Sequence, residues 1–146
     1  DKVPGLKITA TPAQHHPSWL PRFFSGHVIG FVIEFDNQQG GVLYISGDTV
    51  YFKGIKQIAE RFKINQALIH LGGVQFPYLS GFGRYTFDAK QAIKAINDLD
   101  PKIVIPVHNS GWTHFKEDRA VGKNRLDSAG LDCEFIWLSP GVKTFI

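Results

Sequence analysis

The chain has 146 residues, and its 16 Lys plus Arg against 13 Asp plus Glu leave a formal charge of only +3. Hydrophobic residues make up 43% and charged residues 20%, which is typical of a folded globular domain and argues against disorder. No apolar run approaches the roughly 20 residues of a membrane helix. The basic residues are scattered, so nucleic acid is not an expected partner. The single cysteine, Cys133, cannot form an internal disulfide, which predicts a reducing compartment, the cytoplasm.

The first third of the chain contains the short apolar runs that are typical of β-strands. Between the second and third runs, the polar and Gly-rich residues 36–41 predict a hairpin turn. Thr49 stands where it can cap a helix, because Ile55, Ile58 and further apolar residues recur after it at three- and four-residue spacing. The strands expected here cover residues 6–13, 27–35 and 42–46.

The remainder of the chain alternates strands with helices. Residues 72–85 are rich in Gly and Pro and predict an irregular loop. A helix is expected to begin at Thr86 and to stop before Pro101, and another is expected over residues 114–129. The strands expected here cover residues 67–71, 102–107, 134–138 and 142–145. This alternation predicts a single α/β unit over residues 1–146 with a mixed β-sheet.

Three of the expected strands are followed by a residue that can bind a metal ion: His15, Asp48 and His108. Because ligands collect beyond the carboxyl ends of strands in open α/β sheets, these three residues are expected to converge. Two imidazoles and a carboxylate suit zinc or a similar divalent ion. Taken singly, each residue has a plainer explanation. Either histidine can be a surface residue, and Asp48 can sit at a helix N-terminus.

The strings TPAQH ending at His15, GDT around Asp48 and IPVH ending at His108 resemble, in order and spacing, the later metal motifs of the metallo-β-lactamase-fold hydrolases. The resemblance covers essentially the whole chain. It is closest to the branch with the L-ascorbate-6-phosphate lactonases and N-acyl-phosphatidylethanolamine phospholipase D. It implies a pair of divalent ions, zinc or alternatively manganese or iron. His15 would bind one ion, His108 the other, and Asp48 would bridge both as the catalytic carboxylate that orients the attacking water.

The same resemblance implies hydrolysis of an ester, lactone or phosphodiester in a small-molecule or lipid-like substrate. The family's first motif, His-x-His-x-Asp-His, has no counterpart among the six histidines of this sequence. We therefore expect the chain to be the C-terminal half of an αββα sandwich, inactive alone and partnered by the absent N-terminal half that carries the motif. A non-catalytic scaffold or interaction half-domain is the alternative, and a nuclease is a weaker one. The oligomeric state stays open.

Three further residues are candidates for the wall of a substrate pocket: His70, at a strand end, and Trp112 and His114, in the loop after His108. For His70 the main alternative is a structural role, and Trp112 can equally serve in packing. Aromatic residues on two other segments predict either an apolar pocket wall or a surface that faces the missing half. These residues are Trp19, Phe23, Phe24, Phe76, Tyr78, Phe82 and Tyr85.

Overall fold

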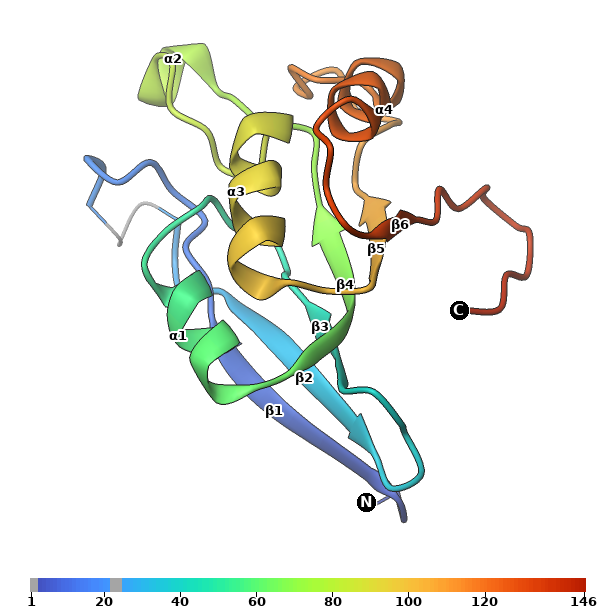
Figure 1. Ribbon diagram of the computed structural model, residues 1–146. Helices are drawn as coiled ribbons and strands as arrows, with labels where there is room; N and C mark the ends of the chain where they lie inside the picture. Colours follow the sequence, from blue (N-terminus) through green and yellow to red (C-terminus); the bar gives the residue numbers. More distant parts are fainter. Residues whose placement is uncertain (1–2, 22–24) are drawn as a thin grey trace.

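A mixed β-sheet organises the computed structural model, which describes residues 3–21 and 25–146. Within these residues, six strands pair in the order of the sequence (Figure 1). The first, second and third strands pair antiparallel, and from the third strand to the sixth each neighbouring pair is parallel. This mixed pairing confirms the predicted mixed α/β architecture. The strands are β1 (Leu6–Pro12), β2 (Ile29–Phe35), β3 (Val42–Ile45), β4 (Ile64–His70), β5 (Ile103–Val107) and β6 (Glu134–Phe135).

Helices connect the parallel strands, because parallel neighbours require a crossover connection. Helix α1 (Gly54–Arg61) joins β3 to β4, and α4 (Arg119–Asp127) joins β5 to β6. Between β4 and β5 lie the short α2 (Pro77–Ser80) and the longer α3 (Ala89–Leu99). Helices α1 and α3 pack against each other on one face of the sheet (Figure 1). In the part of the chain that the structure describes, none of the helices has the length and apolarity needed to cross a membrane.

The hydrophobic core lies between the sheet and these helices. Strand side chains such as Val32, Tyr44 and Val104 are fully buried there. Their helix partners include Ile55 of α1 and Ala92 of α3, in the same buried cluster. Burying a side chain of this kind contributes about 1.5–3 kcal/mol, so the core fixes how the helices sit on the strands. It thereby fixes where the loops after the strands begin.

The opposite face of the antiparallel strands is also apolar, but it is only partly covered. Ile8 of β1 pairs with Ile33 of β2, and Phe31 pairs with Ile45 of β3, so their side chains share this face. Ile8 is 56% exposed, and Phe35 is 51% exposed. A contiguous apolar surface on a sheet is typical of a face that packs against further protein.

Thr49 does not cap α1, and the prediction that it would is wrong. The N-cap position of α1 is Lys53, which makes no side-chain capping hydrogen bond. Thr49 is instead fully buried, and its hydroxyl accepts a hydrogen bond from the backbone N–H of Gln14 at 2.9 Å. Thr49 therefore links two loops that are distant in the sequence and does not cap the helix that follows it.

The start of α3 also differs from the prediction. The helix begins at Ala89, and the preceding Asp88 caps it by accepting a hydrogen bond from the backbone N–H of Gln91. Thr86 lies before the helix, where its buried hydroxyl donates to the carbonyl of Leu71 at 2.9 Å. The expected irregular loop contains one short helix, α2, and otherwise lacks regular structure as predicted.

The C-terminal part has less regular structure than expected. Helix α4 begins only at Arg119, because the side chain of Asp118 caps it by accepting from Val121. Strand β6 has two residues, both paired with β5, and the described residues 142–145 form no strand. A short apolar run forms a strand only where a neighbouring edge can satisfy its backbone. Between these two segments the chain turns, and a hydrogen bond from Val142 N to the Ser139 carbonyl at 3.1 Å closes the turn.

Candidate metal and substrate site

Three candidate residues meet at the carboxyl ends of β3, β4 and β5. Asp48 lies in the loop after β3, His70 is the last residue of β4, and His108 directly follows β5. Because these strands are parallel neighbours, their ends lie at one edge of the sheet. The Oδ1 atom of Asp48 lies 3.7 Å from Nδ1 of His108. The rings of His70 and His108 are 5.9 Å apart between centroids.

His108 is held in an unusual backbone conformation. Its φ angle is +56°, in the left-handed region that non-glycine residues seldom adopt, and such strain clusters at functional sites. Its Nδ1 atom lies 3.4 Å from the carbonyl of Leu71, and the Phe115 ring packs edge-on at 4.8 Å. Gly72 allows this arrangement, because a Cβ there would come within 2.7 Å of the His108 carbonyl. The surrounding loop therefore holds the imidazole toward Asp48.

The Gly-Asp-Thr segment has a physical reason for each of its residues. Gly47 has φ +60°, and a Cβ at this position would lie 2.6 Å from the carbonyl of Ile29. Only glycine fits this conformation without strain. Thr49 ties the segment to the loop of Gln14 through the hydrogen bond described above. Asp48, between them, is therefore fixed at the sheet edge by its two neighbours.

His15 is oriented by a backbone carbonyl. Its Nδ1 donates to the carbonyl of Tyr85 at 2.8 Å, which leaves Nε2 as the nitrogen with a free lone pair. Such an outer partner is typical of metal-binding histidines, because it fixes the tautomer and the ring orientation. The contact between Gln14 and Thr49 brings the His15 segment beside the Asp48 segment.

His70 is positioned by Ser46, a buried residue that the sequence analysis did not single out. The Ser46 hydroxyl accepts from the backbone N–H of His70 at 3.0 Å and lies 3.2 Å from its Nδ1. The pKa of His70 is lowered, mainly because the side chain is buried and to a smaller extent because His108 is near. The nearby Asp48 carboxylate opposes this shift but does not reverse it. His70 is therefore a neutral imidazole near neutral pH. Ser46 thus holds His70 beside Asp48 and His108, and both the pocket role and the structural role of His70 stay predictions.

The imidazole nitrogens and carboxylate oxygens of the candidate residues are groups that bind divalent ions, but they do not form a complete set of metal ligands. Within residues 3–21 and 25–146, no group of three or more His, Cys, Asp or Glu side chains is arranged to hold a metal ion. The structure brings Asp48, His108 and His70 together, whereas His15 enters from the neighbouring loop. Because a zinc ion usually takes four ligands, a complete site needs donors in addition to these.

Trp112 and His114 border this site indirectly. Their rings are 5.4 Å apart, and His114 also lies 5.4 Å from the Phe115 ring, which contacts His108. Trp112 is 64% exposed, so it is not a core residue. Their assignment to a substrate pocket stays a prediction. Of the aromatic residues considered with them, Phe23 and Phe24 lie outside the described residues.

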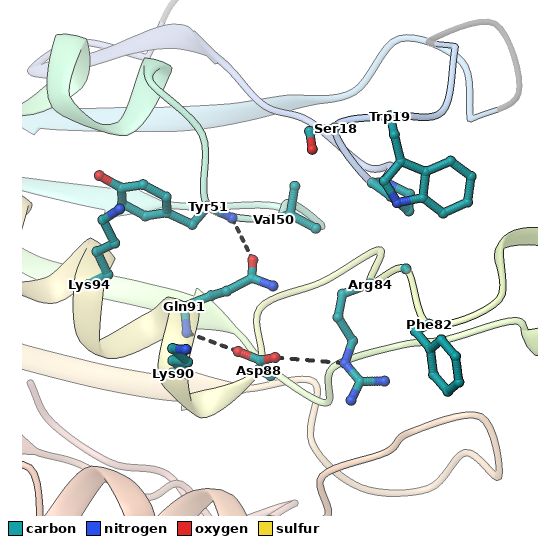
Figure 2. Close-up of a pocket in the computed structure, with 12 residues that line it drawn as sticks. Ser18, Trp19, Val50, Tyr51, Phe82, Arg84, Asp88, Lys90, Gln91 and Lys94 are labelled. Carbon is teal, nitrogen blue, oxygen red and sulfur yellow. Dashed lines mark hydrogen bonds and ion pairs between the residues drawn. The ribbon is translucent and has the colours of Figure 1, made fainter.

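A cavity of about 550 Å³ lies between helix α3 and the segments that follow His15 and Asp48 in the chain. Figure 2 shows the residues that line it. Two of its wall residues, Pro17 and Val50, follow closely after His15 and Asp48 in the chain. The walls also include Trp19, Tyr51, Phe82, Arg84, Lys90 and Lys94. An apolar pocket wall is one of the two alternatives that the sequence offers for Trp19 and Phe82, and both line this cavity. The two lysines were not among the candidate residues, although their four-residue spacing places them on one side of α3.

One wall of the cavity is braced by side-chain contacts. The backbone N–H of Tyr51 donates to Oε1 of Gln91 at 2.8 Å, which ties the loop after Asp48 to α3. The Tyr51 hydroxyl donates to the Asp98 carboxylate, and this hydrogen bond raises the pKa of Tyr51 to about 12. The ammonium group of Lys94 lies 4.2 Å from the centre of the Tyr51 ring.

Comparison with known proteins places this arrangement in a family. The profile of the Beta-lactamase superfamily domain matches residues 2–109, which include all three strand ends described above. This chain belongs to the beta-lactamase superfamily. The resemblance that the sequence motifs carry is therefore confirmed at the level of the superfamily.

Similar proteins in this superfamily carry related names. The chain is 35% identical over 131 residues to a UPF0173 metal-dependent hydrolase of Nanoarchaeum equitans, a match that covers 88% of this chain and 54% of that protein. The structure of Igni18, a metallo hydrolase from Ignicoccus hospitalis, matches with a TM-score of 0.70 and 31% identity over 95% of this chain and 52% of Igni18.

A third similarity, to the crystal structure of an isothiocyanate hydrolase from Delia radicum gut bacteria, has a TM-score of 0.79 at 21% identity. It covers 97% of this chain and 55% of that protein, and it concerns the fold alone. The chain thus spans about half the length of the relatives that it matches. The predicted α/β fold with a mixed sheet is confirmed by these neighbours.

Proposed function

We propose that this chain supplies one part of the active site of a metal-dependent hydrolase. The observation that carries the proposal is the pair formed by Asp48 and His108, 3.7 Å apart at the carboxyl ends of parallel strands. The superfamily assignment and the names of the relatives support the same activity.

In this proposal, His15, Asp48 and His108 bind divalent ions together with ligands from outside the chain. The Nε2 atom of His15 is suited to this role, because its Nδ1 is already engaged by a carbonyl. The carboxylate of Asp48 offers two oxygens and so suits a bridging position between a pair of ions. Zinc, the number of ions and the branch of the superfamily stay predictions.

The bound ions would supply an activated water for attack on an ester, lactone or phosphodiester. The chain's own residues would prepare the site for that attack. Asp48 would orient the attacking water through a hydrogen bond to its carboxylate. His70, held by Ser46 and neutral near neutral pH, would offer its imidazole to a polar group of the substrate.

We also propose that the half-covered apolar face of β1 and β2 packs against another part of the same protein, the N-terminal half expected from the sequence. Ile8, Ile29 and Phe35 each leave half or more of their surface exposed on this face. The match to only about half the length of the relatives supports this proposal. That half would bring the His-x-His-x-Asp-His motif and complete the ligand set.

The activity is tested in the full-length protein that carries this chain, with 4-nitrophenyl acetate and bis(4-nitrophenyl) phosphate as probes and added Zn²⁺ or Mn²⁺. Asp48→Ala is expected to reduce metal-dependent hydrolysis by at least about a hundredfold, a typical loss for an essential site residue. The matched control is Asp132→Ala, because the Asp132 side chain is fully exposed and its ion pair, with Lys102 at 3.7 Å, lies outside the candidate site. Unchanged turnover in Asp48→Ala would remove the proposal.

A second candidate is an interaction half-domain without catalysis. The incomplete ligand set among the described residues favours it. The sequence that precedes residue 1 in the full-length protein separates the two candidates. A His-x-His-x-Asp-His string there supports the enzyme, whereas its absence supports the interaction module.

A further inference from the structure

We propose that the cavity beside helix α3 binds an amphipathic anion, with its charged head at Lys90 and Lys94 and its apolar part along Trp19 and Phe82. The geometry of the cavity alone supports its role as a binding site. Its assignment as the substrate pocket rests on the proposed function. The proposal thus adds a substrate class to that function.

The charge of the cavity favours an anion. Arg84 and Asp88 lie 3.7 Å apart as an ion pair, so their charges largely offset each other (Figure 2). Lys90 and Lys94 remain, and neither forms an ion pair with a carboxylate among the described residues. Two cations one helical turn apart favour a phosphate or carboxylate between them.

Nearby acidic groups do not cancel this charge. The Asp98 carboxylate, four residues after Lys94, is engaged by the Tyr51 hydroxyl and lies 3.9 Å from Lys56. The Lys94 ammonium group instead lies over the Tyr51 ring. Its position is therefore set by an aromatic ring, and its hydrogen-bond donors remain available to a ligand.

The other end of the cavity is apolar and exposed. Figure 2 shows Trp19 and Phe82 at one end of the pocket and Lys94 with Tyr51 at the other. Trp19 is 63% exposed and Phe82 is 96% exposed, so both rings have surface that a ligand can bury. Large aromatic side chains of this kind contribute strongly when an apolar group covers them.

A neighbouring cavity extends this apolar end. It has a volume of about 490 Å³ and shares Trp19, Phe82 and Gly83 with the first cavity. Tyr78 and Leu79 add further apolar wall. Because the two cavities share these residues, an alkyl or aryl group that lies against Trp19 has room to continue between them. A ligand with a charge at one end and an apolar group at the other matches a cavity that is basic at one end and apolar at the other.

The cavity is also placed to present a ligand to the candidate ion-binding residues. The segment with Val50 and Tyr51 continues directly from Asp48, and the backbone carbonyl of Tyr85, next to Arg84, orients His15. The bond from Tyr51 to Gln91 holds this wall to α3. A molecule anchored at Lys90 and Lys94 therefore lies against the segments that continue from Asp48 and His15.

The test measures binding of octyl phosphate by calorimetry, with EDTA present so that a metal ion cannot contribute. Inorganic phosphate and octanol carry the charge and the apolar chain separately, and both are expected to bind at least about tenfold more weakly than octyl phosphate. Since no turnover is measured, a negative result here is distinct from a failure of the hydrolase proposal.

The variants assign the binding to this cavity. Lys90→Glu with Lys94→Glu is expected to weaken octyl phosphate binding by at least about tenfold, and Trp19→Ala with Phe82→Ala by a similar factor. The control, Lys63→Glu with Lys143→Glu, makes the same charge change at exposed positions outside both cavities. Equal affinity in the first variant and the control would overturn the proposal, and so would octanol binding as tightly as octyl phosphate.

Discussion

The carboxylate of Asp48 and the imidazole of His108 lie 3.7 Å apart, although one follows β3, the other follows β5, and β4 runs between them. The loop after each strand must therefore lean over the end of β4. At Asp48, the Gly47 turn produces this bend, and at His108 the left-handed backbone produces it. The pair is thus a consequence of the two turn conformations and of the sheet order together.

The first prediction concerns the Gly47 turn. Gly47→Ala is expected to lower the free energy of unfolding by about 2–4 kcal/mol, because a Cβ in left-handed backbone is strained and would also contact the Ile29 carbonyl. Gly130→Ala is the matched control, since Gly130 has φ +67° with open space around its Cβ position. It is expected to cost only about 1–2 kcal/mol. Urea unfolding measures both, and equal losses would show that the carbonyl contact is unimportant.

The second prediction concerns Ser46. Ser46→Ala is expected to destabilise the chain by about 1–3 kcal/mol, because it leaves the backbone N–H of His70 without its hydrogen-bond partner. Ser110→Ala, at an exposed position, is expected to change stability by less than about 0.5 kcal/mol. Thermal unfolding of the two variants checks this. A Ser46→Ala variant as stable as the original chain would contradict the role given to this hydroxyl.

The third prediction concerns the reactivity of Cys133. Burial raises the pKa of its thiol, the Asp132 carboxylate raises it further, and Lys102 lowers it. Since the thiolate is the reactive form, Cys133 is expected to react with a disulfide reagent more slowly than an exposed cysteine at neutral pH, and faster as the pH rises. Asp132→Asn should speed the reaction and Lys102→Gln should slow it. Both changes should shrink at high salt, because these side chains are exposed.

The sequence predicted the positions of Asp48 and His108 because local patterns determine them. Each follows an apolar run long enough to form a buried strand, and the alternation of strands and helices predicted parallel neighbours. Helix α3 was predicted from its local apolar spacing in the same way, although its start was placed at Thr86 and not after the Asp88 cap. These features depend on residues that are close together in the chain.

Other features depend on contacts between distant segments, and the sequence did not predict them. Thr49 has the spacing of a helix cap, but its hydroxyl bonds to the loop of Gln14. The run at 142–145 has the composition of a strand, but it does not pair with one in the described residues. A pocket wall was one alternative for Trp19 and Phe82, but that these rings meet Lys90 and Lys94 of α3 in one cavity depends on the folded chain.

The central claim, that Asp48 and His108 bind metal, is tested most directly by elemental analysis of the full-length protein after metal loading and dialysis. We expect about two divalent ions per chain in the original protein, and clearly less metal in both Asp48→Asn and His108→Gln. His27→Gln, at an exposed position outside the site, should keep the full metal content. If Asp48→Asn and His108→Gln retain as much metal as His27→Gln, the metal site lies elsewhere and the account is wrong.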